Sequence, residues 1–395
     1  MEASLPPSET TWCPGPFSHQ VGGHFPLLAM GDGKIGKPAL DAEVHFYEHI
    51  LPHYPRLRSL VPSYLGCIEL DLGEVWQLGN RVAAAAAEEW EQVGCEPSGK
   101  SDPTELSRSE TETGFKRKLW QKFLRRYSVE LSANNANGRV PIMLLEDLTS
   151  PFREPCILDI KLGRAPIGKD DQVPSAKLKR QRWKCLNTTT GPLALRLNGM
   201  QVWQKKTATY RVKDKYWGQG IRENTLLPAL KAFFDNGERI RIEVIRHLLG
   251  KLSEVEVALR EARSYSLYSS SVLLIYDGVD ADAVNYGDLM GSGTRERVLA
   301  DVRVIDFAKG CQEGPVGMSN EEPGSIGETD GAGLLLGLQN LQKLLAGVLA
   351  GEGEEDEVMT VEPEAELPSE GDAPPAPLKA TAGSPPSPSQ SPSHP

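Results

Sequence analysis

An aspartate and a lysine stand two residues apart inside an apolar segment, and this pair is the first place in the sequence where chemistry is expected. The segment runs from Pro155 to Gly163, and its apolar residues and closing glycine predict a strand. Alternate side chains of a strand leave the same face, so Asp159 and Lys161 point the same way. Because burying either charge is costly, the two residues are either a structural ion pair or part of a site.

A run of basic residues follows this segment. Between residues 161 and 184 the chain carries eight lysines and arginines, opposed only by two aspartates: Lys161, Arg164, Lys169, Lys177, Lys179, Arg180, Arg182 and Lys184. Such a run is usually a solvated helix face, but here it stands in a nearly neutral body, which favours a polyanionic ligand. Nucleic acid is disfavoured as that ligand, because Trp183 is the only aromatic residue of the run and no nucleic-acid-binding module is recognisable.

Two further charged positions have the spacing of a nucleotide site. Lys37 precedes a predicted helix that contains Glu43, and the two can form the ion pair that positions a phosphate-binding lysine in kinase-like folds. Two solvated charges are the alternative. Asp306 closes an apolar segment and is followed by Phe307 and Ala308, which resembles the Asp-Phe-Gly element that holds catalytic magnesium in protein kinases.

Hydrophobic periodicity and turn residues predict the elements that must position these residues. The glycines Gly22 and Gly23 precede two short strands around a turn at Asp32 and Gly33. A strand over 140–145 runs into the polar residues 146–149, as expected of a hinge between two lobes. Further strands are expected over 193–202, 209–212, 269–278 and 302–309, an aromatic turn over 215–218, and helices over 41–50, 116–127, 226–234, 243–263 and 334–349.

The composition of the 395-residue chain fits two domains or one bilobal enzyme. Its net charge of −11 is concentrated in residues 351–395, where ten acidic residues oppose Lys379 alone. The six cysteines have no metal-ligand spacing, no signal peptide is recognisable, and no apolar run is expected to span a membrane. We therefore expect a reducing compartment, the cytoplasm or the nucleus or both.

Together these motifs resemble the inositol polyphosphate kinase family, whose signature Pro-x-x-x-Asp-x-Lys-x-Gly is met at Pro155, Asp159, Lys161 and Gly163. Within that family the sequence is most similar to the inositol hexakisphosphate kinases. The segments that carry this closer similarity are residues 19–24, 37–38, 180–190, 200–203, 215–218, 268–271 and 305–308.

The resemblance implies an α+β fold of two lobes, related to protein kinases, with ATP in the cleft between them. Residues 16–148, with a flexible insertion at about 82–115, would form the N-terminal lobe, and residues 149–350 the C-terminal lobe with the inositol-phosphate site. A loose N-terminus (1–15) and a disordered acidic, Pro/Ser-rich tail (351–395) would flank them, and any protein partners of the tail are unknown.

The resemblance also implies a role for each candidate residue. ATP would be bound by Lys37, Glu146, Leu148 and Asp159, and magnesium by Asp306 and Ser271. Catalysis would fall to Lys161 and Asp306. The inositol phosphate would be held by Lys161, Lys177, Arg180, Gln181 and Lys184.

The implied reaction transfers the γ-phosphoryl group of ATP to a phosphate of inositol hexakisphosphate and makes a diphosphoinositol. Because the acceptor oxygen is already ionised near neutral pH, positioning and charge neutralisation suffice without a general base. Two alternatives stay open: a multikinase that phosphorylates ring hydroxyls of inositol tris- and tetrakisphosphates, and a non-catalytic inositol-phosphate sensor or scaffold. The sequence departs from the family at Lys309, where a histidine is usual, at Gly36, where a larger residue is usual, and at residues 334–336, where an aromatic residue is common.

Overall fold

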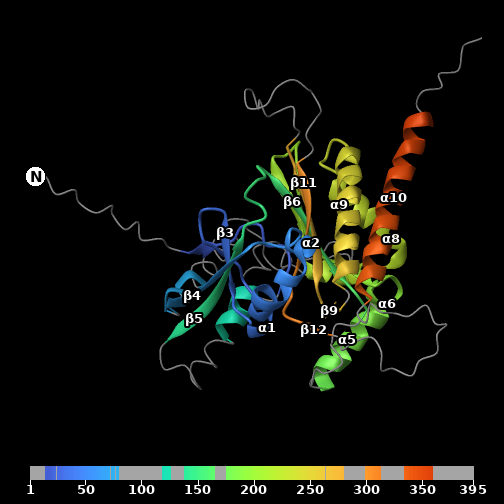
Figure 1. Ribbon diagram of the computed structural model, residues 1–395. Coiled ribbons are helices and arrows are strands. Elements are labelled where there is room, and N and C mark those ends of the chain that lie inside the picture. Colours follow the sequence, from blue (N-terminus) through green and yellow to red (C-terminus); the bar gives the residue numbers. More distant parts are fainter. Residues whose placement is uncertain are drawn as a thin grey trace, which may run out of the picture. The chain divides into compact units, whose positions relative to one another are not determined.

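The computed structural model (Figure 1) describes residues 14–79 except 24, 72 and 76, and residues 118–125, 138–164, 175–279 except 263, 299–312 and 333–358. The side chains of residues 175–177, 310–312 and 352–358 are not part of that description. The expected insertion at about 82–115 and the tail beyond residue 358 lie outside it, as does the N-terminus before residue 14. The chain divides into two units, Met1–Gly353 and Glu354–Pro395, and the core and the site belong to the first.

The first sheet has five antiparallel strands in the order β1-β2-β3-β5-β4. Its strands are β1 (Gly15–Pro16), β2 (Leu28–Ala29), β3 (Lys34–Pro38), β4 (Tyr64–Asp71) and β5 (Arg139–Glu146). The predicted strands on either side of the Asp32-Gly33 turn are confirmed as β2 and β3. After β3 come α1 (Asp41–His45), a π-helical turn (Phe46–Ile50), a 3-10 turn (Leu51–His53) and α2 (Pro55–Arg58).

Residues 118–125 form a helix that packs on this first sheet. Trp120 and Phe123 are buried in one hydrophobic cluster with Ile142 of β5. Lys118 and Lys122 are exposed. The apolar spacing of the helix therefore fixes it to the first sheet and leaves its lysines outside that hydrophobic cluster.

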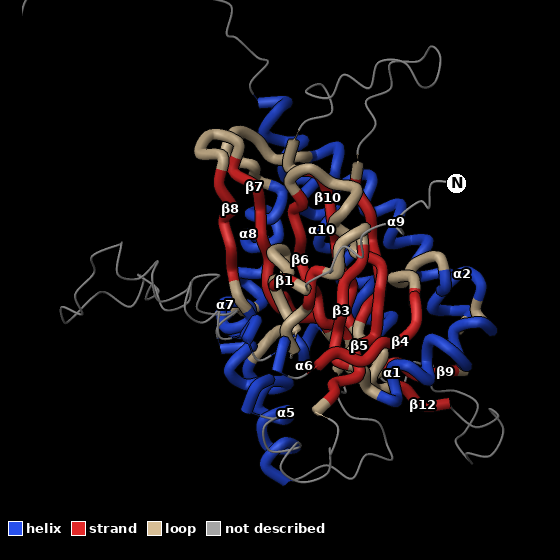
Figure 2. The backbone as a smooth tube through the Cα atoms, turned by 90° about the vertical axis from the view of Figure 1, so that its left-hand side faces the viewer, coloured by secondary structure: helices blue, strands red, loops and turns tan. Residues whose placement is uncertain are grey.

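The second sheet has the order β11-β10-β6-β7-β8, again antiparallel throughout (Figure 2). Its strands are β6 (Pro155–Leu162), β7 (Leu195–Gln204), β8 (Thr209–Lys213), β10 (Ser271–Asp277) and β11 (Ala300–Ile305), with a separate pair of β9 (Tyr265–Leu267) and β12 (Gly310–Gln312). β6 is the central strand, and Lys161 is its one residue that is not fully buried. The predicted Asp159/Lys161 strand thus lies at the middle of the sheet.

Three long helices cover the face of the second sheet that points away from the first sheet: α8 (Glu223–Phe234), α9 (Ile242–Glu261) and α10 (Leu334–Val358) (Figure 1). The predicted apolar stripe of α9 is confirmed as core, since Ile245, Leu248, Leu252, Val255 and Leu259 are all buried. Three shorter helices, α5 (Ser175–Asn187), α6 (Thr190–Leu193) and α7 (Lys215–Gly220), gather near one end of the sheet (Figure 2).

Two expectations from the sequence need correction. Residues 215–218 form the start of α7 rather than a turn, because the Asp214 carboxylate caps the helix by accepting hydrogen bonds from the N–H groups of Tyr216 and Trp217. By length and composition alone, α10 over Leu334–Gly351 could cross a membrane, although no such segment was expected. Leu338, Leu341 and Leu345 of this helix are fully buried in the main hydrophobic core, and this packing accounts for its apolar composition.

Candidate active site

A cavity of about 660 Å³ lies between the two sheets and is lined by residues of both. Its volume lies within the range of about 300–1,000 Å³ that is usual for small-molecule sites. The side of the first sheet contributes Gln20, Lys37, Glu146 and Leu148, among others. Asp159, Lys161, Arg180, Gln181, Lys184 and Asp306 enter it from the other side. The cavity therefore brings together most of the candidates that the sequence placed far apart.

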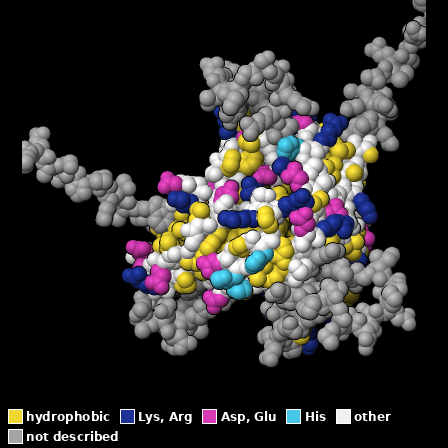
Figure 3. All heavy atoms as spheres, viewed as in Figure 1, with side chains coloured by type: hydrophobic (Ala, Val, Ile, Leu, Met, Phe, Trp, Pro, Cys, Tyr) yellow, Lys and Arg dark blue, Asp and Glu magenta, His cyan; other side chains and the backbone are white. Residues whose placement is uncertain are grey.

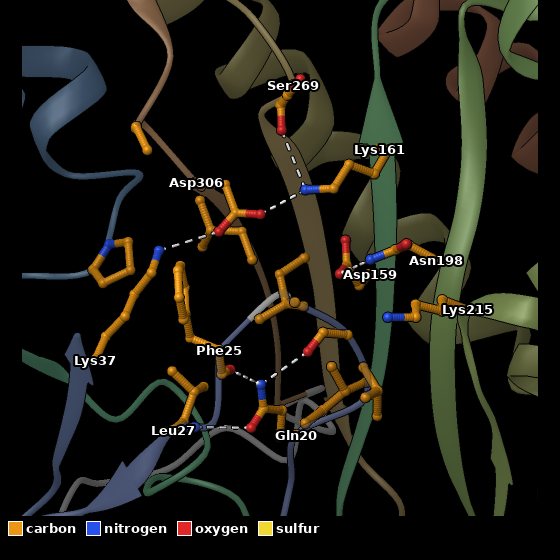
Figure 4. Close-up of a pocket in the computed structure, with 18 of the residues that line it drawn as sticks. Gln20, Phe25, Leu27, Lys37, Asp159, Lys161, Asn198, Lys215, Ser269 and Asp306 are labelled. Atoms are coloured by element: carbon orange, nitrogen blue, oxygen red, sulfur yellow. Dashed lines mark hydrogen bonds and ion pairs between the residues drawn. The ribbon is translucent and has the colours of Figure 1, made fainter. Parts of the chain in front are cut away.

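Asp306 is the centre of an ion-pair network that joins the two sheets. Lys37 on β3 contacts Oδ1 of Asp306 at 3.3 Å, and Lys161 on β6 contacts Oδ2 at 2.5 Å. Figure 4 shows the two lysines reaching this carboxylate from different sides. Lys37 also pairs with Glu43 at 2.8 Å, and Glu43 is 1% exposed. The predicted Lys37–Glu43 ion pair is thus confirmed, and the alternative of two solvated charges is wrong.

These charges shift the pKa of each partner in a consistent direction. Burial alone would raise the pKa of Asp306, but the ammonium groups of Lys161 and Lys37 hold it well below its usual range. Burial alone would lower the pKa of Lys37, but the carboxylates of Glu43 and Asp306 raise it above its usual value. Lys37 and Asp306 therefore keep their charges at neutral pH.

Lys161 is anchored to the second sheet and not to its neighbour on the strand. Besides Asp306, its ammonium group donates to Oγ of Ser271 at 2.9 Å and to the carbonyl of Ser269 at 3.2 Å. Asp159 instead accepts a hydrogen bond of 2.7 Å from Nδ2 of Asn198 on β7. The alternative of a simple structural Asp159–Lys161 ion pair is therefore wrong.

Asp159 has one carboxylate oxygen without a partner in the structure. The residue is 3% exposed and Oδ1 makes no hydrogen bond, although Asp159 lines the cavity. Burial raises the pKa of this carboxyl group, with Asp306 adding to the rise and Lys161 opposing it. Because Asp159 lines the cavity, its carboxylate is suited to accept a hydrogen bond from a ligand hydroxyl.

The segment that carries the glycine pair lies directly over Asp159. A Cβ atom built on Gly22 would lie 2.1 Å from Oδ2 of Asp159, so only glycine permits this approach. Gln20 holds the segment in place: its side-chain amide donates to the carbonyls of Gly22 and Phe25 and accepts from the N–H of Leu27 (Figure 4). Close packing against Asp159 thus requires glycine at position 22, beyond what an ordinary turn would require.

Cations crowd the part of the cavity near α5 and α7. Arg180 and Lys184 come from α5, Arg196 from β7 and Lys215 from α7, and all four line the cavity. The pKa of Lys184 is lowered by burial and then by Arg196, Lys215, Arg180 and Lys161. Lysines and arginines held this close together are costly without an anion among them.

Not every residue that was predicted to bind substrate or metal can be placed at the cavity. Arg180, Gln181 and Lys184 line the cavity, whereas the side chain of Lys177 lies outside the described residues. Ser271, predicted to bind metal, is fully buried and its hydroxyl accepts from Lys161, so its metal role stays a prediction. Lys309, which replaces the usual histidine of the family, lines the cavity.

Several residues of the cavity were not among the candidates predicted from the sequence: Gln20, Asn198, Arg196, Lys215 and Lys122. Asn198 and Arg196 stand in an apolar strand, where a polar residue is a signal of use or pairing. Lys122 gave no such signal, because a lysine on an amphipathic helix is normally solvated.

The site fits a divalent metal that takes most of its ligands from a nucleotide. Among the described residues, no three His, Cys, Asp or Glu side chains lie close enough to hold an ion by themselves. Magnesium in kinases is typically held by one or two carboxylates plus substrate phosphates, and Asp306 can supply such a carboxylate. Its φ angle of 67° is rare for a residue other than glycine and is of the kind found at functional sites.

Comparison with known proteins agrees with this geometry. Residues 142–346 match the model of the inositol polyphosphate kinase family. Inositol hexakisphosphate kinase 3 of Mus musculus is 29% identical over 386 residues, covering 85% of this chain and 95% of the relative. Inositol hexakisphosphate kinase 2 of Oryctolagus cuniculus is 29% identical over 416 residues, covering 86% of this chain and 95% of the relative.

A solved structure shows the same fold. The inositol phosphate multikinase Ipk2 from S. cerevisiae, in complex with ADP and Mn2+, superposes with a TM-score of 0.50 at 20% identity, covering 80% of this chain and 99% of that chain. The predicted two-lobed α+β fold is confirmed. The chain belongs to the inositol polyphosphate kinase family, and it is an inositol phosphate kinase, a phosphotransferase.

Proposed function

We propose that this protein is an ATP-dependent inositol hexakisphosphate kinase that makes a diphosphoinositol. The observation that carries the proposal is the density of cations beyond Lys161, where Arg180, Lys184, Arg196 and Lys215 line one cavity. A ligand with six phosphate groups carries more negative charge than an inositol tris- or tetrakisphosphate, and it gains more from such a cluster. The similarity to relatives named inositol hexakisphosphate kinases supports the same substrate.

The chemistry of the cavity favours a phosphate acceptor over a ring hydroxyl. A hydroxyl acceptor calls for a general base, and the best base has a pKa near the working pH. Asp306 is a poor base because Lys37 and Lys161 hold its pKa well below its usual range. At residue 309 the chain has a lysine, a further cation, where the family usually has a histidine that can titrate near neutral pH.

The roles of the remaining residues follow from their contacts. Lys37, held by Glu43, would contact the phosphates of ATP, and the Asp159 carboxylate would accept a hydrogen bond from the ribose. The backbone of Glu146 and Leu148, at the link between β5 and β6, would hold the adenine. Lys161, which reaches Asp306, would neutralise charge on the phosphoryl group during transfer.

Magnesium is the metal that this proposal assigns to the site. Asp306 would hold it, with Ser271 beside it, and the bound ion would neutralise charge on the ATP phosphates. We further assign the protein to the cytoplasm, the nucleus or both, with no membrane attachment. Nucleic acid is not expected as a substrate, and on the face shown in Figure 3 basic and acidic side chains lie interspersed and form no continuous basic surface.

Product analysis tests the proposal. The purified protein is incubated with ATP, magnesium and, in turn, inositol hexakisphosphate, a tetrakisphosphate and a trisphosphate, and the products are separated by strong anion exchange. We expect a diphosphorylated product from the hexakisphosphate as the main outcome. Turnover of the trisphosphate or tetrakisphosphate without that product would establish the multikinase alternative, and binding without any turnover would establish the sensor.

A further inference from the structure

Two lysines, Lys118 and Lys215, lie over the ring of Tyr216 at the edge of the cavity. A third, Lys122, lines the same cavity, and of the three only Lys215 is among the cations of the proposed function above. Lys215 and Tyr216 begin α7, beside the second sheet. Lys118 and Lys122 lie one turn apart on the helix over residues 118–125, which packs on the first sheet. Nζ of Lys118 is 5.8 Å and Nζ of Lys215 is 5.5 Å from the centroid of the Tyr216 ring. Lysines of both lobes thus lie within cation–π distance of one aromatic ring.

This meeting point belongs to the active-site cavity. Lys122, Lys215 and Tyr216 all line it. In Figure 4 the side chain of Lys215 points into the same space as Asp159. Tyr216 is 48% exposed, so its ring is not held by burial in a core and stays open to a ligand. A ligand in the cavity can therefore touch the lysines of both lobes.

The local charges disfavour the arrangement when no anion is bound. The pKa of Lys215 is lowered, first by burial and then by Lys122 and Lys118, with Asp214 acting in the opposite direction. Lys122 is exposed on its helix and could point elsewhere at no cost in packing. An anion between the lobes would convert this repulsion into attraction.

We propose that Lys122 and Lys215 form a phosphate subsite between the lobes, which takes one phosphate group of the inositol substrate and so couples substrate binding to lobe closure. The inference rests on the proposed function, since it names a further contact for the same polyanion. Lys118 is not among the residues that line the cavity, and its part is the cation–π contact with the Tyr216 ring. Asp306 is contacted by Lys37 and Lys161, so this subsite is assigned a phosphate that is not transferred.

Steady-state kinetics test the subsite with Lys122→Gln, Lys215→Gln and the double variant. Lys206→Gln is the matched control, because Lys206 is an exposed lysine of the β7–β8 hairpin outside the cavity. We expect each single variant to raise KM for inositol hexakisphosphate about tenfold, with KM for ATP within about twofold of wild type. The double variant should lose less than the product of the two effects, since both lysines hold one phosphate. If KM for inositol hexakisphosphate in these variants equals that of Lys206→Gln, or if KM for ATP rises instead, the subsite is refuted.

Hydrogen exchange can show whether the subsite is absent independently of whether the proposed function is correct. Inositol hexakisphosphate without ATP should protect amides of residues 118–125 in the wild type, and Lys215→Gln should lose that protection although it lies on the other lobe. This readout needs binding and no turnover, so a protein that binds the ligand without phosphorylating it would refute the proposed function alone. Protection that is absent in the wild type, or unchanged in Lys215→Gln, would refute the subsite.

Discussion

Lys161 and Asp306 form an ion pair of 2.5 Å although 145 residues separate them along the chain. The register of the second sheet accounts for it. Lys161 on β6 lies opposite Ser271 on β10, which in turn lies opposite Ile305 on β11. The lysine therefore reaches across β10 to the residue that follows Ile305. Asp306 takes its left-handed conformation where the chain leaves the strand, and its carboxylate meets lysines from both lobes.

Asp306→Asn should abolish turnover and leave inositol-phosphate binding intact. The substitution removes the one negative charge shared by Lys37 and Lys161, and with it the proposed metal ligand, while the cations near α5 and α7 are untouched. We expect kcat to fall at least about 100-fold, as when a single electrostatic stabiliser of a transition state is lost. Transfer of the phosphoryl group to the product measures turnover, and calorimetry measures the binding of inositol hexakisphosphate. Full activity in this variant would remove Asp306 from the mechanism.

Glu43→Gln should weaken both the fold and ATP binding. Glu43 is 1% exposed and pairs with Lys37 at 2.8 Å, so the variant leaves a largely buried ammonium group with Asp306 alone. Breaking a buried ion pair at one partner costs about 3–5 kcal/mol, and we expect the lower end because Asp306 remains. Glu254→Gln is the control, because its i,i+3 pair with Lys251 is exposed and worth about 0.5 kcal/mol or less. Urea unfolding of the two variants measures the difference, and equal stability would mean that Glu43 does not hold Lys37.

Gly22→Ala should raise KM for ATP and spare the inositol phosphate. The added Cβ atom would lie 2.1 Å from Oδ2 of Asp159 and 2.8 Å from Nδ2 of Asn198, so the segment must move off the carboxylate proposed to hold the ribose. Gly15→Ala is the control, since a Cβ atom there meets nothing within 4 Å. Nucleotide binding followed by fluorescence, together with KM for each substrate, tests it. Nucleotide affinity equal to that of Gly15→Ala would show that the segment adjusts freely.

Much of this architecture could be predicted from the sequence, because local pattern encodes strands and helices. The strand of Asp159 and Lys161, the helix of Glu43 and the apolar stripe of α9 all follow from periodicity and are present. Asp214 is of a residue type that often caps helices, so it could have indicated α7, whereas the aromatic residues after it favoured the prediction of a turn.

The Lys37–Glu43 pair was predicted from its spacing, but the partners that charged residues meet across a sheet could not be, because they depend on the register between distant strands. The spacing of Asp159 and Lys161 left open whether they form an ion pair or belong to a site, and Lys161 pairs with Asp306 through the order β6-β10-β11. A shift of register between Asp159 and Ile160 in the pairing of β6 with β7 further separates the environments of the two residues. Lys122 joins the cavity only because its helix packs on the other lobe, which no local pattern of one sequence reveals.

The affinity for inositol hexakisphosphate should fall at alkaline pH before an ordinary lysine would titrate. The pKa of Lys184 is lowered by burial and by Arg196, Lys215, Arg180 and Lys161, so the free protein loses this charge at a pH below the usual lysine value of about 10.4. A bound polyanion favours the charged form, so binding at alkaline pH is accompanied by proton uptake, and affinity declines as pH rises toward that value.

Lys184→Arg isolates the effect, because arginine keeps its charge over the whole range. Its affinity should decline less with pH than that of the wild type, and the growing charge of the ligand itself is common to both proteins. Calorimetry in two buffers of different ionisation enthalpy counts the protons taken up. The same pH profile in both proteins, with no proton uptake by the wild type, would show that Lys184 does not touch the ligand.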